Sequence, residues 1–185
     1  KLWRFEATEA YTAMGSVAAS VRDAAPLSAA QRLAVQYDNG MALVHDTETL
    51  GLERAWSASG PEFGWSIAAA REGDGLALLC DVFAPLLVDS ATGALAARLP
   101  VHPAYVYSVA LDASGRLCAT TAWDGVVRVF DTGSGEEVKA MSSPDTLLEA
   151  IEFSPDGAYL AGVSRSGDLF LWEWREEPLR ALHQF

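Results

Sequence analysis

The sequence of 185 residues contains few cysteines and few basic residues, and each shortage excludes a class of protein. Two cysteines, Cys80 and Cys118, are too few for a disulfide framework, so we expect a reducing compartment. Lys and Arg number 13 against 25 Asp and Glu, and the formal net charge of -12 is the wrong sign for binding phosphate backbones or anionic lipid. Nucleic acid and membranes are therefore not expected as direct partners.

The sequence also lacks a long apolar run, and none approaches the roughly 20 residues that a membrane-spanning helix requires. Its first residues, Lys1–Phe5, have neither the basic start nor the apolar stretch of a signal peptide. We therefore expect an intracellular protein, cytoplasmic, or nuclear in a eukaryotic cell. Because the chain begins at Lys1 without an initiator methionine, we also expect it to be part of a longer polypeptide.

A repeat runs through the sequence, in which half of the residues are apolar. The last residues of five apolar runs fall at positions 4, 46, 89, 131 and 173, in steps of 42, 43, 42 and 42. A second marker agrees, because Gly73, Gly115 and Gly157 each close a turn and lie 42 residues apart. A fixed period of this kind indicates units that bury their apolar faces against one another.

Each period contains short strands separated by turns. The best-formed period predicts strands at Val106–Leu111, Arg116–Ala122, Val126–Phe130 and Glu136–Met141. The Asp124-Gly125 pair between the second and third of these is a hairpin signal. The next period predicts the same order at Leu148–Phe153, Ala158–Ser164, Asp168–Trp174 and Pro178–His183. Four antiparallel strands per period form the sheet unit, or blade, of a β-propeller.

Two of these periods resemble WD40 repeats. The residues that carry the similarity are His102 to Val109, Leu111 to Leu117, Trp123 to Gly125, Val127 to Asp131, Phe153 to Gly157 and Leu171 to Glu173. The resemblance implies an all-β fold, a β-propeller segment of about four four-stranded antiparallel blades plus two strands of a preceding blade.

The repeat spacing divides this single WD40-like region, residues 1–185, into units. We expect the end of a preceding blade at 1–16, with strands at Lys1–Phe5 and Ala10–Ser16, and blades at 17–59, 60–101, 102–143 and 144–185. The family most often forms closed rings of seven blades. The missing blades would come from the rest of the chain or from a second copy.

The resemblance also assigns a structural role to residues that pin the strands of a blade together. WD40 blades typically use a hydrogen-bonded set of His, Ser or Thr, Asp and Trp. Here His102 and Asp124 stand at these positions in the third blade and Trp172 in the fourth. Neither blade has the full set, because Phe130 occupies the Trp position of the third and Ser166 the Asp position of the fourth. We expect less rigid blades in an unchanged fold.

One segment, Val129 to Ser134, resembles the active-site turn of aspartic proteases. That mechanism needs two carboxylates that share a proton, and a second Asp-Thr-Gly is absent from the sequence, so it would require a homodimer with paired Asp131 residues. Asp131 has the same repeat position as Asp46 and Asp89, which favours a role in the turn. We therefore expect no enzyme activity and no catalytic residues.

The sequence indicates no metal and no other cofactor. Its histidines are scattered, without a cysteine or acid at ligand spacing: His45, His102 and His183. Phosphate-binding glycine loops and nucleophile elbows are absent from it. The two cysteines fall on predicted second strands, where small apolar side chains are buried.

The remaining chemistry is surface recognition. In WD40 proteins the partner usually meets the loops before first strands and between second and third strands. The repeat spacing places seven candidate partner-binding residues there: Trp65, Tyr107, Glu149, Trp123, Arg165, Asp81 and Asp38. Large aromatic and arginine side chains are good interface anchors, because they remove much area from water.

The sequence thus predicts a non-catalytic scaffold that binds peptide-like segments of other proteins in a multiprotein complex. Two alternatives stay open: a structural or regulatory propeller part of a larger protein whose activity lies elsewhere, and an aspartic-type hydrolase that uses Asp131 in a homodimer. A small-ligand site in a central channel is disfavoured, because the expected first strands are strongly apolar: Val17–Val21, Trp65–Ala70, Tyr107–Leu111 and Glu149–Phe153.

Overall fold

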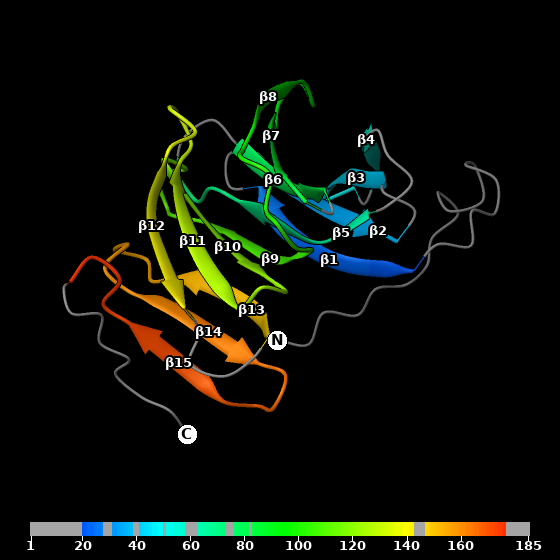
Figure 1. Cartoon of the computed structure of the whole chain (residues 1–185). Coiled ribbons are helices and arrows are strands. Elements are labelled where there is room, and N and C mark those ends of the chain that lie inside the picture. Colours follow the sequence, from blue (N-terminus) through cyan, green and yellow to red (C-terminus); the bar gives the residue numbers. More distant parts are fainter. Residues whose placement is uncertain are drawn as a thin grey trace.

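The computed structural model describes residues 20–27, 31–38, 41–49, 51–57, 63–72, 76–81, 83–142 and 147–176. These residues form four antiparallel sheets, which we call blades one to four (Figure 1). Blade one consists of β1 (Val21–Leu27), β2 (Arg32–Tyr37), β3 (Met41–Asp46) and β4 (Leu52–Ser57), and blade two of β5 (Phe63–Ala69), β6 (Leu76–Asp81), β7 (Pro85–Asp89) and β8 (Leu95–Arg98). Blade three consists of β9 (Val106–Leu111), β10 (Leu117–Ala122), β11 (Val126–Asp131) and β12 (Glu137–Ser142), and blade four of β13 (Leu148–Phe153), β14 (Leu160–Ser164) and β15 (Leu169–Trp172).

Neighbouring strands in each sheet follow one another in sequence, so every blade is a simple antiparallel meander. Tight turns make this possible. Gly125 and Gly167 have φ angles of +73° and +93°, in the left-handed region that residues with a side chain rarely adopt. Both glycines close the turn between the second and third strand of a blade, and their N–H groups donate to the carbonyl oxygens of Ala122 and Ser164.

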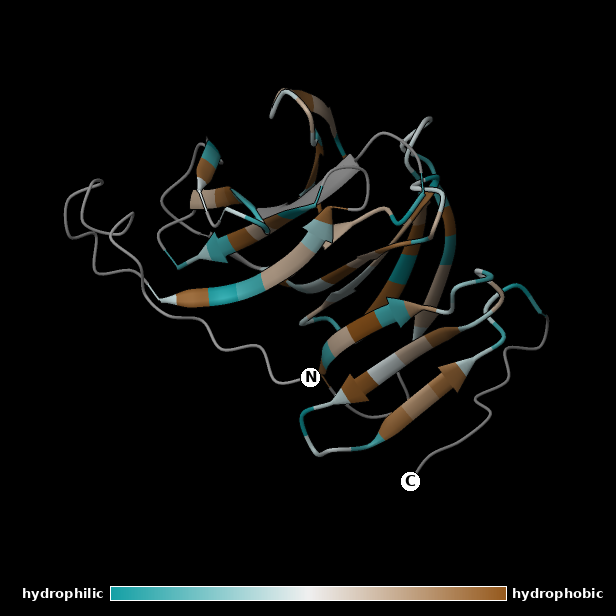
Figure 2. Ribbon diagram, turned by 180° about the vertical axis from the view of Figure 1, so that it is seen from behind, coloured by the Kyte–Doolittle hydropathy of each residue, from teal (hydrophilic) through white to brown (hydrophobic). Residues whose placement is uncertain are grey.

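The blades stand side by side in chain order, and their first strands are neighbours. Figure 1 shows β1, β5, β9 and β13 toward the common centre, with β4, β8 and β12 on the outside. Contacts join β1 to β5, β5 to β9 and β9 to β13. Figure 2 shows brown, hydrophobic segments mostly along the strands, whereas most connecting turns are teal or white.

Among the described residues the core consists of three apolar clusters, and each cluster joins two consecutive blades. One connects blade one with Ile67, Leu86 and Val88 of blade two. The next connects Leu87 of blade two with blade three, where it includes Phe130. The alternation along β7 therefore sends Leu86 and Val88 to one neighbour and Leu87 to the other, because successive side chains of a strand point to opposite faces.

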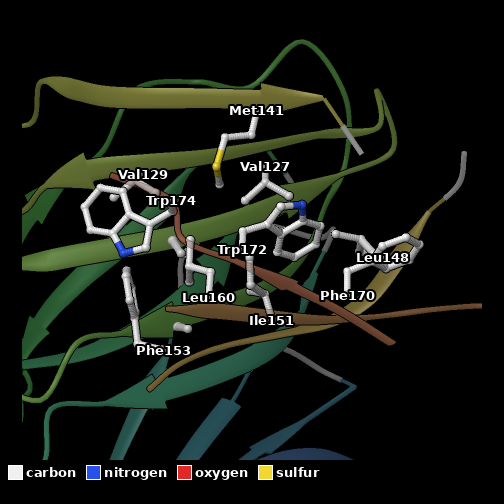
Figure 3. Packing of buried hydrophobic residues seen from close by; sticks show 12 residues of the cluster. Val127, Val129, Met141, Leu148, Ile151, Phe153, Leu160, Phe170, Trp172 and Trp174 are labelled. Atoms are coloured by element: carbon white, nitrogen blue, oxygen red, sulfur yellow. The ribbon is translucent and has the colours of Figure 1, made fainter. Parts of the chain in front are cut away.

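The third cluster joins blades three and four and contains the largest side chains. Figure 3 shows Val127, Val129 and Met141 of blade three over Leu148, Ile151, Leu160, Phe170, Trp172 and Trp174 of the following segment. Trp172 packs close to the backbone of β14, because the neighbouring residue Gly162 has no side chain. A Cβ added at Gly162 would lie 2.8 Å from Cζ3 of Trp172 and 3.2 Å from Cδ1 of Leu148.

Hydrogen bonds from polar residues on the first strands also hold consecutive blades together. Asp23 Oδ2 accepts from the hydroxyl of Ser66 at 2.9 Å and from the backbone N–H of Ile67 at 3.0 Å. Ser108 Oγ accepts from the backbone N–H of Ile151 at 3.2 Å. Asp23, Ser66 and Ser108 occupy the same repeat position, in steps of 43 and 42 residues. At this position Asp23 and Ser108 each bond a backbone N–H of the following blade.

The prediction of a first strand at Val17–Val21 was wrong, because β1 spans Val21–Leu27. Arg22, Asp23 and Pro26 suggest a turn in the sequence. In the structure, Asp23 bonds the next blade, and β1 is an edge strand of its sheet, a place where a proline without an N–H is tolerated.

Two predicted strands have the bounds that the structure gives, Val106–Leu111 and Leu148–Phe153. Other predicted strands begin or end one or two residues away from the observed bounds. The predicted strands at Lys1–Phe5, Ala10–Ser16 and Pro178–His183 lie outside the described residues. The part of the chain that the structure describes contains no helix long and apolar enough to cross a membrane.

Replacing Gly162 by alanine is expected to destabilise the protein by about 1–3 kcal/mol, because the new methyl group collides with Trp172. Chemical denaturation of the purified variant measures this change. Blade three holds Thr120 and Phe130 at the equivalent positions, 42 residues earlier in each case. The double variant with Trp172→Phe should therefore recover part of the loss, and a Gly162→Ala protein as stable as the parent would contradict the packing described here.

Candidate functional site

Two of the predicted partner-binding residues occupy matching exposed turns of consecutive blades. Trp123 lies in the β10–β11 turn with 55% of its surface exposed, and Arg165 lies in the β14–β15 turn with 73% of its side chain exposed. The N–H of Trp123 donates to the carbonyl of Tyr105 at 2.9 Å, and the N–H of Arg165 to that of Leu147 at 3.1 Å. Equivalent backbone hydrogen bonds thus hold Trp123 and Arg165 at the same end of the blades. We call this end of the blades the turn end.

The structure brings Glu149 to Arg165. Glu149, near the start of β13, pairs with the Arg165 guanidinium, with 3.8 Å between Oε1 and Nε. Both side chains are exposed, so this ion pair contributes little to stability. Tyr107 is half-buried within β9.

The other three candidates are placed less fully. Asp38 is half-buried after β2, and its N–H donates to the carbonyl of Ser20 at 2.9 Å. Trp65 belongs to β5 and Asp81 ends β6, and their side chains lie outside the described part of the chain.

Two exposed aromatic residues of the turn end were missed by the sequence analysis. Phe83 follows β6 and Tyr105 precedes β9, and each has 39% of its surface exposed. A signal for Tyr105 exists, because Phe63, Tyr105 and Leu147 share one repeat position. Phe83 stands 42 residues before Gly125, where blades three and four have a turn glycine, so the repeat pattern pointed away from it.

Beneath the turn end, a buried polar network fixes the loops of blade three. His102 is 2% exposed, and its Nε2 lies 3.2 Å from the hydroxyl of Thr120. Its Nδ1 lies 3.2 Å from Nη1 of Arg128, and Nη2 of Arg128 donates to Asp124 Oδ2 at 2.7 Å. Arg128 therefore bridges the histidine and the aspartate, an arrangement that the sequence analysis did not foresee.

The network determines the protonation of His102. A guanidinium can only donate, so Nδ1 of His102 must accept, and the ring proton lies on Nε2, which donates to Thr120. Burial, reinforced by the charge of Arg128, lowers the pKa of His102 from 6.5 to about 4. Burial alone would raise the pKa of Asp124, but its bonds from Arg128 and from the N–H of Val126 outweigh this and lower it.

Phe130 and Trp172, at the Trp position of blades three and four, are both buried in apolar clusters. The ring of Phe130 meets the ring of His102 edge-on, with 5.7 Å between centroids. In blade four, Ser166 donates to Asp168 Oδ2 at 2.6 Å, so a serine and the aspartate two residues later close the turn.

Asp131 closes a turn. Its Oδ1 accepts from the N–H groups of Gly133 at 2.9 Å and Ser134 at 2.8 Å. Asp46 and Asp89 accept in the same way from Thr49 and Thr92. The bond from the Ser134 N–H is the largest influence that lowers the pKa of Asp131. Both N–H donors belong to the turn that Asp131 itself begins, and Asp46 and Asp89 form the same turn, so this geometry favours a turn-closing role over the hydrolase hypothesis.

The described residues contain no group of three or more His, Cys, Asp and Glu side chains that could hold a metal ion. Cys118 is a fully buried thiol in the cluster between blades two and three, and its Sγ lies 3.7 Å from the carbonyl oxygen of Ala119. The side chain of Cys80 lies outside the described residues.

The arrangement of the sheets defines the chain as part of a β-propeller. It superimposes on the solved structure titled "Structure of U3-55K" with a TM-score of 0.77 and 11% identity, covering 89% of this chain and 52% of that chain. For "Crystal Structure of Mitotic Checkpoint Complex" the TM-score is 0.73 at 17% identity, covering 86% of this chain and 49% of the other.

The family model described as "WD domain, G-beta repeat" matches residues 93–131 and 135–173. The chain thus contains two segments that match the WD40 repeat. It is 30% identical over 85 residues to small ribosomal subunit protein RACK1z of Arabidopsis thaliana, covering 46% of this chain and 25% of that protein. It is 34% identical over 86 residues to periodic tryptophan protein 2 homolog of Schizosaccharomyces pombe, covering 46% of this chain and 10% of that protein. The chain thus spans a quarter or less of these relatives.

The lowered pKa of His102 predicts a loss of stability in mild acid. The folded protein keeps the imidazole neutral, whereas the unfolded chain protonates it near pH 6.5, so this contribution is complete above pH 6.5 and is lost as the pH falls toward 4. Between pH 7 and pH 5 the free energy of unfolding should fall by about 2 kcal/mol more in the parent than in a His102→Gln variant. Urea denaturation at both pH values measures it, and parallel losses would contradict the assignment.

Proposed function

We propose that this chain is a non-catalytic protein–protein interaction scaffold that binds peptide segments of partner proteins at the turn end of its blades, within a multiprotein complex. WD40 propellers are typically protein-interaction scaffolds. The observation that carries the proposal is the exposure of Trp123 and Arg165 on matching turns, held by the same backbone bond in each blade. Tryptophan and arginine are the side chains most enriched among residues that dominate binding energy.

We also propose that the repeat units run at 17–59, 60–101, 102–143 and 144–185, after the end of a preceding blade at 1–16. Further blades would then cover the free face of blade four. Leu169 has the repeat position of Val127, and it is 39% exposed, whereas Val127 is 1% exposed beneath blade four. The rest of a longer chain or a second copy would supply these blades.

An intracellular site of action is part of the proposal. The Arabidopsis relative is by name a ribosomal subunit protein, which supports this location. The partner surface needs no cofactor, because its anchors are aromatic and charged side chains.

The double variant Trp123→Ala, Arg165→Ala is expected to lose at least one stoichiometric partner. Affinity purification of the intact natural protein under native conditions, followed by mass spectrometry, measures the loss. A truncation of an interface anchor typically weakens binding by about 2 kcal/mol or more, which is roughly 30-fold.

A matched control removes an exposed apolar side chain and a guanidinium from another part of the surface. Leu95 is 57% exposed on the outer strand β8, and Arg116 is exposed at the opposite end of β10 from Trp123. Leu95→Ala with Arg116→Ala should retain all partners. If the turn-end variant also retained every partner, the segment would be a structural part of a larger protein.

A further inference from the structure

Three exposed aromatic side chains of the turn end form one continuous row across the boundary between blades two and three. We call Phe83, Tyr105 and Trp123 the aromatic row. The rings of Phe83 and Tyr105 are stacked, with 4.9 Å between centroids. The rings of Tyr105 and Trp123 meet edge to face at 5.2 Å. Exposed fractions of 39%, 39% and 55% show that a packed cluster of this size remains open to water.

The backbone holds the aromatic row in place before any partner arrives. The N–H of His102 donates to the carbonyl of Phe83 at 2.7 Å, and the N–H of Trp123 to that of Tyr105 at 2.9 Å. The buried ring of His102 is in turn fixed by Thr120 and Arg128. A surface that is already ordered loses little conformational entropy when it binds, which raises affinity.

The charges around the aromatic row favour a cation. Carboxylates at this end of blades three and four belong to Asp124, Glu149 and Asp168. The Arg165 guanidinium is shared with Glu149, and that of Arg128 is 15% exposed and bonded to Asp124. With a formal net charge of -12, the chain as a whole attracts basic segments and repels a second copy of itself.

We infer that the aromatic row receives an arginine side chain of a basic peptide segment. The inference rests on the proposed function and names the chemistry of its partner. A guanidinium is planar, stays charged and stacks on aromatic faces, and tryptophan is the aromatic side chain that binds a cation best. Trp123 supplies the face and Tyr105 and Phe83 the apolar floor beside it, while the net charge of -12 attracts the cation.

Two pools of 12-residue peptides test this chemistry. The flanking positions are randomised in the same way in both pools. The fixed central residue is arginine in one pool and citrulline in the other, and citrulline has the same shape as arginine without its charge. Retention of each pool on the immobilised intact protein is compared for the parent, Trp123→Leu and the control Leu95→Ala. The arginine pool should bind roughly 3- to 30-fold more tightly than the citrulline pool. Trp123→Leu keeps an apolar side chain but removes the aromatic face, so it should abolish the preference, and Leu95→Ala should keep it.

Equal retention of the two pools by the parent would overturn the inference. If the partners were nevertheless lost from the Trp123→Ala, Arg165→Ala variant, the proposed function would stand without it. If the Trp123→Leu variant still preferred the arginine pool, the carboxylates alone would bind the cation, and this result would also overturn the inference. Self-association of the parent that Trp123→Leu abolishes, with no preference between the pools, would make a second copy the occupant instead.

Discussion

The constraint on which this structure depends is that each sheet must bury both of its faces against other sheets. A four-stranded blade has no helix to cover it, so its apolar side chains find cover only on the neighbouring blades. The alternation of Leu86, Leu87 and Val88 between two clusters is the direct result. Asp23 and Ser108, which share one repeat position, each add a hydrogen bond to the backbone of the next blade near the centre. Apolar burial thus holds the blades against one another, and the hydrogen bonds between first strands align them.

This same stacking produces the candidate binding surface. Loops from two consecutive blades meet at the turn end, and the aromatic row exists only because blade two places Phe83 beside Tyr105 of blade three. The buried network of His102, Thr120 and Arg128 lies directly below and fixes these loops. The side chains that hold blade three together therefore also shape its exposed end. Protonation of His102, whose pKa is lowered, would disturb both the blade and that end.

Much of the architecture could be predicted from the sequence because it is local and periodic. The Asp124-Gly125 pair and the alternation within Val106–Leu111 each specify a hairpin or strand without reference to distant residues. The exposed turn positions of Trp123 and Arg165 followed from the same spacing. Strand β1 could not be found in this way, since the role of Asp23 appears only when the next blade stands beside it.

The contacts of the candidate site were also beyond prediction, since they cross blade boundaries. Phe83 replaces a turn glycine and breaks the repeat, and its stacking partner comes from another segment. Arg128 looked like an ordinary strand residue, yet it replaces a direct bond between His102 and Asp124. Side-chain contacts of this kind form between residues whose separation in the sequence does not follow the repeat, so the repeat spacing cannot predict them.

The contrast between Gly162 with Trp172 and Thr120 with Phe130 bears on how repeats of one chain evolve. An ancestral blade that was duplicated can pass from one pair to the other only through an intermediate with a collision or a void. The two positions must therefore change together, and each copy becomes committed to its own solution. Blades three and four have consequently stopped being interchangeable modules. A copy of blade three transplanted into the place of blade four would bring a threonine and a smaller ring to an interface shaped around an indole.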